Sequence, residues 1–337
     1  MSNNVIAIVI SQNDVDVIDR TIESLLKQKI KKELFYIVAV DFGSTDGTYE
    51  KLLSFDRHRM GVYQVTKNVR SEQFPAEAVI FALQTAPSGD EKYYFTIRAG
   101  DTVEPELSAY GLTLMEQYKS MSPVMVIFET SIENEEGLII HTPALYNEAF
   151  VIDGMQNYIE YLNRSYDHNV FCFSSYPPHH LPSYSLQVAN DCTKWNNLFY
   201  RNYHRNALYV PKVFANTRKR KGEDSVFSVL SNYATLLSHI RCVREMYASH
   251  EKETEYIIAL KNLAFSSLFN ACAEFENKNK EISEDLLLLS QVVYPDIISE
   301  ALFKGTTEYI LSQGNKPSFE INYTLPPPDG SLVIDAR

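Results

Sequence analysis

The sequence predicts an α/β fold in which a mostly parallel sheet carries helices on both faces, followed by a helical C-terminal part. Short, continuous apolar runs such as residues 5–10 alternate with segments whose apolar residues recur at helical spacing. Such runs are typical of parallel strands buried on both faces. Between residues 225 and 313, proline and glycine are almost absent, which favours packed helices. The alternation therefore indicates repeated strand–helix units with a helical appendage.

Length and composition indicate a globular protein with one large domain and a smaller part. The chain has 337 residues, of which 45% are hydrophobic and 22% are charged, a balance that supports a buried core. Its formal net charge of −12 repels polyanions over most of the surface, which excludes general nucleic-acid binding. The cysteines have neither zinc-ligand nor disulfide-framework spacing. We expect free core thiols at Cys172, Cys192, Cys242 and Cys272.

No apolar run approaches the roughly 20 residues that a membrane-spanning helix needs. The chain runs from Met1 into an apolar strand without a preceding basic segment, so a secretory leader is not expected. We therefore expect a cytoplasmic protein without a transmembrane segment. Peripheral attachment at the inner face of the membrane, or origin from a longer chain, stays open as an alternative.

The first strand is expected at residues 5–10 and ends at polar residues 11–14. Ile18, Ile22 and Leu25 then fall on one helix face, with Asn13 or Asp14 as the expected N-cap. A second strand, turn and helix follow, and the pattern continues to residue 128. The expected elements are strands at 35–40, 61–66, 93–97 and 124–128, and helices after the turn at 41–47, at 72–85 and from Glu104-Pro105.

Polar residues should gather at the carboxyl ends of these strands, where ligands bind in open α/β sheets. Ser11, Asn13, Asp41 and Asp101 all fall there. After the strand expected at 124–128, the sequence is irregular and aromatic up to about residue 190, which is typical of acceptor-binding loops and of plain insertions.

The turn Asp41-Phe-Gly-Ser-Thr-Asp-Gly-Thr48 resembles the V-D-D-G-S-T-D-G-T signature of family 2 inverting glycosyltransferases, with Phe42 in place of an aspartate. A carboxylate at a strand end can accept the N–H of a nucleobase, and Gly43 permits a tight turn. The alternative is a helix-capping turn without a ligand. The resemblance implies a GT-A, Rossmann-like fold whose nucleotide pocket is lined by Asp41, Gly43, Ser11 and Asn13. For the first loop, helix capping is an equal alternative.

In that family the fourth strand ends in L-D-x-D-D, whose aspartates bind Mn²⁺ or Mg²⁺. Here the corresponding residues are Ile97-Arg-Ala-Gly-Asp101. Hard divalent cations prefer carboxylate oxygens, so the loss of two carboxylates weakens such a site. The resemblance implies a metal or diphosphate contact at Asp101, with Arg98 placing a fixed positive charge near the phosphates.

A second segment, Thr193-Lys-Trp-Asn-Asn-Leu-Phe-Tyr-Arg201, is similar to the family's N-K-L-F-R element and precedes Glu223-Asp224. The resemblance implies that Asp224, or alternatively Glu223, is the general base for the acceptor hydroxyl. Acidic residues at a helix start also favour the helix dipole without any catalytic role. Nearby, a basic cluster begins at Arg218 and ends at Lys221. Such a cluster can bind a phosphate of the donor or the acceptor, or it can form an ordinary solvated loop.

These observations predict a glycosyltransferase domain at 1–235, a helical region at 236–315 and an extended, proline-containing tail or linker at 316–337. The resemblance implies inverting transfer from a nucleotide-diphosphate donor, a UDP-sugar first of all, to a glycan, polysaccharide or teichoic-acid-like (polyol-phosphate) acceptor. A catalytically degenerate domain that acts as a binding or assembly module is the alternative, and a nucleotidyltransferase is a weaker one. The helical region could contact a second copy or a membrane complex.

Overall fold

The computed structural model describes most of the N-terminal half of the chain and part of the remainder. The described residues are 3–55, 59–65, 78–79, 81–82, 85, 91–133, 137–140, 144, 146–154, 156–157, 170–176, 205–218, 257, 260–261, 264–265, 267–268, 271–272, 274–275, 278–312, 327–328 and 330–336.

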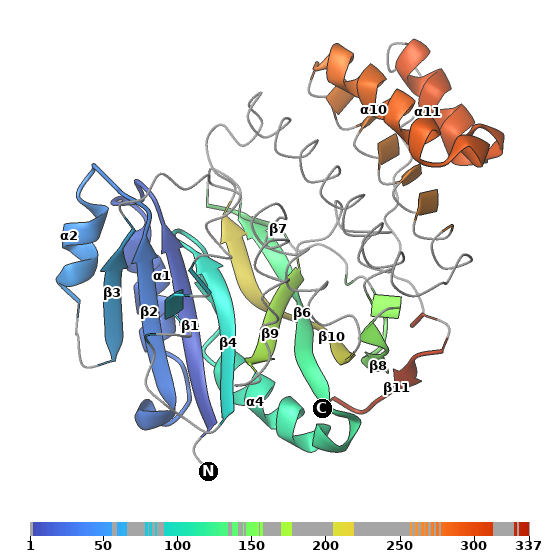
Figure 1. The fold of residues 1–337 in the computed structure, drawn as a ribbon. Coiled ribbons are helices and arrows are strands. Elements are labelled where there is room, and N and C mark those ends of the chain that lie inside the picture. Colours follow the sequence, from blue (N-terminus) through green and yellow to red (C-terminus); the bar gives the residue numbers. More distant parts are fainter. Residues whose placement is uncertain are drawn as a thin grey trace.

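One mixed sheet organises the described residues (Figure 1). Its strands run in the order β11-β8-β10-β6-β9-β4-β1-β2-β3, while β5 pairs with β10 and β7 pairs with β6. The strand bounds are β1 (Asn3–Ser11), β2 (Phe35–Asp41), β3 (Met60–Gln64), β4 (Glu91–Arg98), β5 (Thr102–Val103), β6 (Pro123–Glu133), β7 (Ile139–Ile140), β8 (Phe150–Ile152), β9 (Val170–Tyr176), β10 (Asn206–Arg218) and β11 (Leu332–Val333).

The N-terminal half of the sheet is parallel, as the sequence predicts. β3, β2, β1 and β4 are parallel neighbours, and β10 is parallel to β6. β9 lies between β4 and β6 and is antiparallel to both. The expectation of an irregular region up to residue 190 is wrong for β8 and β9. Both strands form by pairing with partners far away in the sequence, which local patterns do not reveal.

The helices begin and end close to the expected places. They are α1 (Ile18–Leu26), α2 (Thr48–Leu53), α4 (Leu107–Gln117), α10 (Lys280–Val293) and α11 (Ala301–Leu311), with 3-10 helices η1 (Lys32–Leu34), η3 (Lys119–Met121) and η4 (Pro295–Ser299). Residues 78–79, 81–82 and 85 are helical, and the rest of the helix expected at 72–85 lies outside the described residues.

Two expected helix starts are wrong. Val17 occupies the N-cap of α1 without a side-chain hydrogen bond. The Asp14 carbonyl accepts the N–H groups of Val17 and Ile18 instead, each at 3.0 Å. The helix expected from Glu104-Pro105 begins at Leu107, because the N–H of Glu104 donates to the Phe214 carbonyl at 2.8 Å beside the β5–β10 pair.

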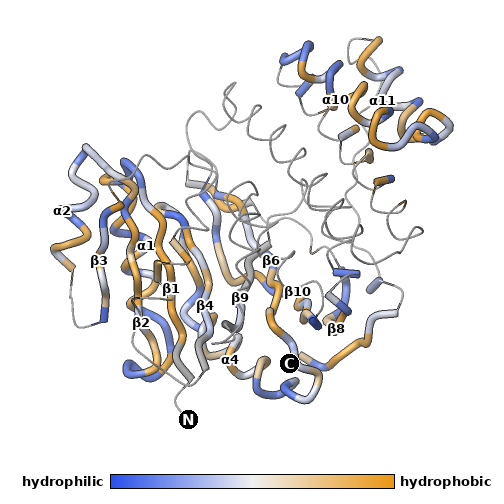
Figure 2. Tube along the Cα trace, in the orientation of Figure 1, coloured by the Kyte–Doolittle hydropathy of each residue, from blue (hydrophilic) through white to orange (hydrophobic). Residues whose placement is uncertain are grey.

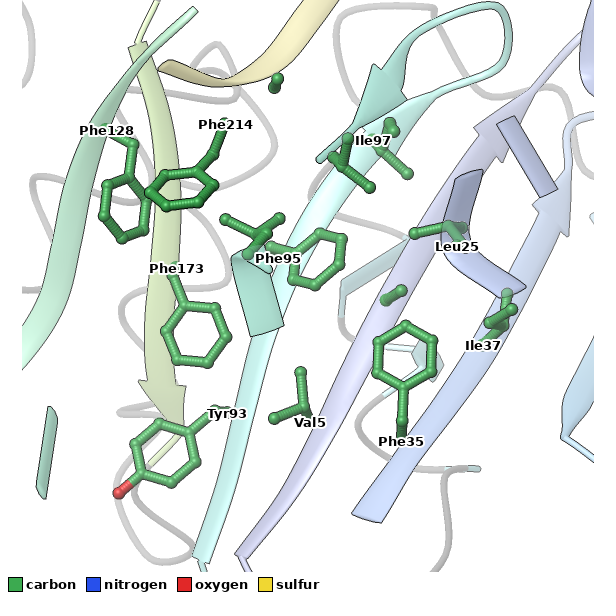
Figure 3. Close-up of a cluster of buried hydrophobic side chains, with 14 of the residues drawn as sticks. Val5, Leu25, Phe35, Ile37, Tyr93, Phe95, Ile97, Phe128, Phe173 and Phe214 are labelled. Atoms are coloured by element: carbon green, nitrogen blue, oxygen red, sulfur yellow. The ribbon is translucent and has the colours of Figure 1, made fainter. Parts of the chain in front are cut away.

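Both faces of the parallel strands are buried. Val5, Ala7 and Val9 of β1 face one apolar cluster, and Ile6, Ile8 and Ile10 face the other. This two-faced burial accounts for the continuous apolar run in the sequence, and Figure 2 shows β1 and β2 as hydrophobic along most of their length. The first cluster is rich in aromatic rings, and Figure 3 shows Phe95 between Phe173 and Phe35, with Tyr93 beside Phe173.

The C-terminal part is helical where it is described. Ala264, Leu268 and Ile297 form a small apolar cluster of their own, and Figure 1 shows α10 and α11 apart from the sheet. The end of the tail is not a free linker. β11 pairs with β8, and the N–H of Ile334 donates to the Ala149 carbonyl at 2.9 Å. The domain boundaries at 235 and 315 stay predictions.

Candidate functional site

The carboxyl ends of the parallel strands lie side by side. Ser11 is opposite Asp41, Ile10 is opposite Arg98, and Asp41 is opposite Gln64. The register therefore brings the predicted residues Ser11, Asp41 and Arg98 to one edge of the sheet, as expected from the switch-point rule. Ser11 and Asp41 are buried, whereas the Arg98 side chain is exposed.

Asp41 is fully buried and holds the turn that follows β2. Its Oδ1 accepts the hydroxyls of Ser11 at 3.4 Å and of Ser44, and its Oδ2 accepts the Ser44 N–H at 3.0 Å and the Gln64 amide at 3.2 Å. A carboxylate offers about four lone-pair positions. All of them are used within the protein, so a nucleobase N–H would have to replace one of these donors. The Ser11 hydroxyl is the most distant of the four.

Phe42 and Gly43 complete this turn. The Phe42 ring is 5% exposed and packs with Ile10 and Val40 in the second apolar cluster. It therefore strengthens the core at the position where the resembled signature has an aspartate. Gly43 is exposed with φ at +72°, in the left-handed region that favours glycine.

Hydrogen bonds tie the loop after β1 to the loop after β2. The Asn13 N–H donates to Ser44 Oγ at 2.8 Å, and Asn13 Oδ1 accepts the Thr45 N–H at 2.9 Å. Asp46 makes the second link, because its Oδ2 accepts the Val15 N–H at 3.0 Å. Asn13 thus joins the two loops and is not the N-cap of α1.

The Asp46 carboxylate also holds the start of α2. It accepts the Thr48 N–H at 3.0 Å and the Thr48 hydroxyl at 2.6 Å. Burial alone would raise the pKa of Asp46, but the hydrogen bonds from Thr48 and Val15 hold its pKa below the usual value. Sequence reasoning did not single out Asp46, although its place before Thr48 is a typical helix-start signal.

The turn after β4 is shaped by Thr21 of α1. The Thr21 hydroxyl accepts the Gly100 N–H at 2.8 Å and donates to the Asp101 carbonyl at 2.7 Å. Gly100 has φ at +95°, and a Cβ there would lie 3.3 Å from Val17 Cγ2. This turn therefore excludes a carboxylate side chain at position 100. The Asp101 side chain points toward β10, where its Oδ1 accepts the Arg218 N–H at 2.9 Å.

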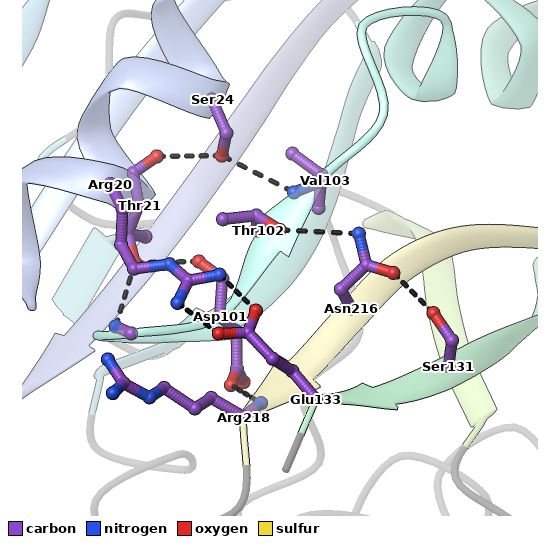
Figure 4. Close-up of polar contacts among 11 residues, drawn as sticks. Arg20, Thr21, Ser24, Asp101, Thr102, Val103, Ser131, Glu133, Asn216 and Arg218 are labelled. Atoms are coloured by element: carbon purple, nitrogen blue, oxygen red, sulfur yellow. Dashed lines mark hydrogen bonds and ion pairs between the residues drawn. The ribbon is translucent and has the colours of Figure 1, made fainter. Parts of the chain in front are cut away.

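Asp101, in the turn after β4, belongs to a cluster of four charged side chains, of which the other three come from α1, β6 and β10 (Figure 4). Arg20 of α1 forms a bidentate ion pair with Glu133 at the end of β6. Both terminal nitrogens of Arg20 donate to this carboxylate, and Nη1 lies 2.6 Å from Oε1. The hydrogen bond from Arg20 holds the pKa of Glu133 below its usual range, with a smaller contribution from Arg218. Glu133 in turn raises the pKa of Arg20, and Asp101 adds to that effect. Arg20 and Glu133 are 113 positions apart, so no sequence signal could have paired them.

The residues at this corner do not fit a divalent cation site of the kind implied by the resemblance. Within the described ranges, no three His, Cys, Asp or Glu side chains converge as metal ligands. Of the two carboxylates nearest to the turn, Asp101 accepts the backbone N–H of Arg218 and lies close enough to the Arg20 guanidinium to raise its pKa, and Glu133 pairs with that same guanidinium. A hard cation needs several free oxygen ligands, and guanidinium groups beside them oppose its binding. Lys221, Glu223, Asp224 and the segment 193–201 lie outside the described residues.

Residues 6–136 match the model of the family described as glycosyl transferase family 2. The chain has a GT-A fold. Crystal structures of S. aureus TarS resemble it: TarS 1–349 in complex with UDP-GlcNAc has a TM-score of 0.58 and 16% identity, covering 93% of this chain and 88% of that one. A longer TarS structure has a TM-score of 0.54 and 15% identity, covering 93% of this chain and 53% of that one.

A third GT-A structure, the mannosyltransferase PcManGT from Pyrobaculum calidifontis in complex with GDP-Man and Mn²⁺, has a TM-score of 0.50 and 12% identity. It covers 92% of this chain and 84% of that one. The chain matches no curated protein sequence. The family match and the fold together support glycosyltransferase as the enzyme class. Among the described residues, no helix has the length and apolar character needed to cross a membrane.

Proposed function

We propose that this chain is an inverting glycosyltransferase that moves a sugar from a UDP-sugar to a hydroxyl of a glycan, polysaccharide or polyol-phosphate acceptor. The observation that carries the proposal is the edge of the GT-A sheet. There, within the matched residues 6–136, β1, β2 and β4 end at Ser11, Asp41 and Arg98. UDP is the preferred nucleotide because the TarS structure with a TM-score of 0.58 contains UDP-GlcNAc.

The proposed donor pocket uses the two linked loops. Asp41 keeps the turn after β2 rigid and presents Gly43, whose missing side chain leaves room for a base or ribose. Ser11 and Asn13 line the pocket from the other loop, and Ser11 is the donor to Asp41 that a nucleobase N–H replaces most easily, at 3.4 Å. The negative charge of the diphosphate requires cations, and Arg98, Arg218 and Lys221 are the candidates.

In the proposed reaction, the acceptor oxygen forms a bond to the anomeric carbon while the bond from that carbon to the diphosphate oxygen breaks. Asp224 takes the hydroxyl proton, with Glu223 as the alternative base. The resemblance also implies Mn²⁺ or Mg²⁺, but the corner around Asp101 does not fit a cation.

Calorimetric titration with UDP, GDP and ADP, followed by a donor-hydrolysis assay with UDP-GlcNAc, tests the proposal. We expect UDP to bind most tightly. Asp224→Asn should keep UDP affinity and lower turnover by about 10²–10⁴-fold, the usual effect of removing a general base. The matched control is Asp296→Asn, an exposed aspartate of η4, which should leave both unchanged. Absence of nucleotide binding, or full turnover by Asp224→Asn, would contradict the proposal.

The alternative is a degenerate domain that acts as a binding module without catalysis. Full activity of Asp224→Asn would favour this alternative, whereas the comparisons do not. The proposed location is the cytoplasm, with peripheral attachment to the inner membrane face as the alternative, and both rest on the sequence. Contact of the helical part with a second copy or a membrane complex is supported by exposed apolar side chains at Leu288, Val292 and Leu311.

A further inference from the structure

We propose that Arg218 and Arg98, and not a divalent cation, supply the positive charge for the donor diphosphate, and that Asp101 is a positioning residue for Arg218. This inference rests on the proposed function, because it assigns a charge partner within the same donor pocket. It also replaces the metal-contact role that the resemblance implies for Asp101.

The turn after β4 has Arg98 at one end and Asp101 at the other. Its N-terminal residue is Arg98, which ends β4 at the site edge and whose side chain is exposed. The backbone N–H groups that follow Arg98 donate within the protein, from Ala99 to the Ile10 carbonyl at 2.9 Å, from Gly100 to the Thr21 hydroxyl at 2.8 Å and from Asp101 to the Arg98 carbonyl at 3.0 Å. Position 100 has φ at +95°, a backbone conformation that favours glycine. The turn therefore presents a guanidinium at one end and a single carboxylate at the other.

The Asp101 carboxylate holds the end of β10. Asp101 Oδ1 accepts the backbone N–H of Arg218 at 2.9 Å, which fixes the last residue of β10 beside the turn. The Arg218 side chain is half-buried and lies close enough to Glu133 to lower the pKa of that carboxyl. One tight turn and one hydrogen bond thus connect Arg98 to Arg218, and Figure 4 shows the Arg218 side chain beside Asp101 and Glu133.

The arginine side chains of this region differ in the partners that they contact. Arg20 engages Glu133 with both terminal nitrogens, so this pair is neutral and a diphosphate gains little from it. Arg218 and Arg98 each add a positive charge at this edge of the sheet, and the contact of Asp101 with Arg218 is to the backbone N–H and not to the guanidinium. A guanidinium binds phosphate oxygens through paired N–H donors in a fixed geometry, and it needs no metal to do so.

The test is calorimetric titration of UDP and of uridine, each in excess EDTA and in excess Mn²⁺. Uridine lacks the diphosphate, so the ratio of the two affinities isolates the phosphate contacts. We expect the UDP dissociation constant to differ by less than about threefold between EDTA and Mn²⁺. Arg218→Gln should weaken UDP by about tenfold or more, as for loss of charge-assisted hydrogen bonds, without a change for uridine.

Four further variants sharpen the test. Arg98→Gln changes an exposed side chain and should weaken UDP in the same selective way even if Arg218→Gln disturbs folding. Lys212→Gln removes an exposed positive charge from the same strand, where it lies over the Tyr110 ring, and should leave UDP affinity unchanged. Asp101→Asn should stay within about threefold of wild type, because an amide oxygen still accepts the Arg218 N–H, whereas Asp101→Ala should weaken UDP.

The outcomes separate the two proposals. UDP binding that rises tenfold or more on addition of Mn²⁺, or that Asp101→Asn abolishes, would overturn the arginine assignment and leave the proposed function standing. UDP affinity unaffected by both arginine changes would do the same. Failure of every nucleotide to bind, with or without Mn²⁺, would overturn both.

Discussion

Asp41 shows how one buried carboxylate can organise a loop. Two hydroxyl groups meet its Oδ1, and two N–H donors meet its Oδ2. Hydroxyl groups can donate or accept, whereas N–H groups only donate. The two oxygens of this carboxylate are therefore not equivalent, and the difference can be tested by substitution.

We predict that Asp41→Asn is tolerated and Asp41→Ala is not. The Asn amide can place its oxygen toward the N–H groups of Ser44 and Gln64 and its nitrogen toward the hydroxyls of Ser11 and Ser44. The expected loss of unfolding free energy is below about 1 kcal/mol for Asp41→Asn. It is about 3 kcal/mol for Asp41→Ala, because alanine leaves several buried donors without an acceptor. Urea unfolding monitored by fluorescence measures both. Equal losses for the two variants would show that the negative charge matters more than hydrogen-bond geometry.

The ion pair of Arg20 and Glu133 predicts a pH dependence. The pKa of folded Glu133 lies below its usual value of 4.5 because Arg20 stabilises the carboxylate. The stabilisation is therefore complete above that value and is lost as the pH falls through the lower folded pKa. We expect Glu133→Gln to cost about 1–2 kcal/mol at pH 7, less than a fully buried pair because Arg20 is 32% exposed.

The measurement is urea unfolding of wild type and Glu133→Gln between pH 7 and pH 3, where the difference should shrink below 4.5. Glu106→Gln is the control, because Glu106 pairs with Lys29 at the exposed surface and should contribute little at any pH. A difference that stays constant down to pH 3 would mean that Glu133 acts through packing and not through its charge.

At the scale of elements, a buried polar contact joins the two central parallel strands β6 and β10. Tyr209 of β10 donates its hydroxyl hydrogen to Glu129 of β6, and both residues are 2% exposed. The same hydroxyl accepts the N–H of Tyr146 at 3.1 Å. Burial raises the pKa of Tyr209 far above its usual range, so the hydroxyl stays a donor at any physiological pH.

We predict that Tyr209→Phe lowers the unfolding free energy by about 1–3 kcal/mol, because it leaves two buried polar groups with one partner fewer. Tyr93→Phe is the matched control, since that hydroxyl meets the half-exposed carboxylate of Glu116 at 3.3 Å and water can replace it. Guanidinium unfolding of both variants gives the comparison. Equal effects of the two substitutions would show that the contact between β6 and β10 adds nothing beyond aromatic packing.

At the scale of the whole molecule, the last residues close the edge of the sheet. β11 extends the sheet beyond β8, and Ile334 and Ala336 pack on the main apolar cluster. Tyr118 of the segment after α4 donates to the Asp335 carbonyl at 2.6 Å, and Tyr110 donates to the Ala336 carbonyl. The first and last parts of the sequence thus share one core.

We predict that removing residues 330–337 lowers the unfolding free energy by about 2–4 kcal/mol, from lost backbone hydrogen bonds and lost apolar burial. Leu332→Ser is the control, because its side chain is 54% exposed and the strand pairs through its backbone. That change should stay within about 0.5 kcal/mol. A truncated chain as stable as the full one would make the tail an independent arm, as the sequence suggests.

Much of the parallel half of the fold follows from local patterns. Apolar runs such as residues 5–10 predict strands because both faces are buried, and polar residues at their ends predict the site edge. The turn after β2 was found from Asp41 and Gly43 for the same reason, since a left-handed residue and a capping side chain are local requirements.

The antiparallel strands, the docked tail and the charged corner depend on contacts between distant segments. β9 is a strand because β4 and β6 flank it, and Arg20 meets Glu133 across 113 positions. Asp101 fits a metal ligand when it is compared with a signature, yet in space it faces the N–H of Arg218. Local residue patterns encode the secondary-structure propensity of a segment and the burial of its faces. The partner of a charged side chain depends instead on which strands become neighbours in the completed sheet.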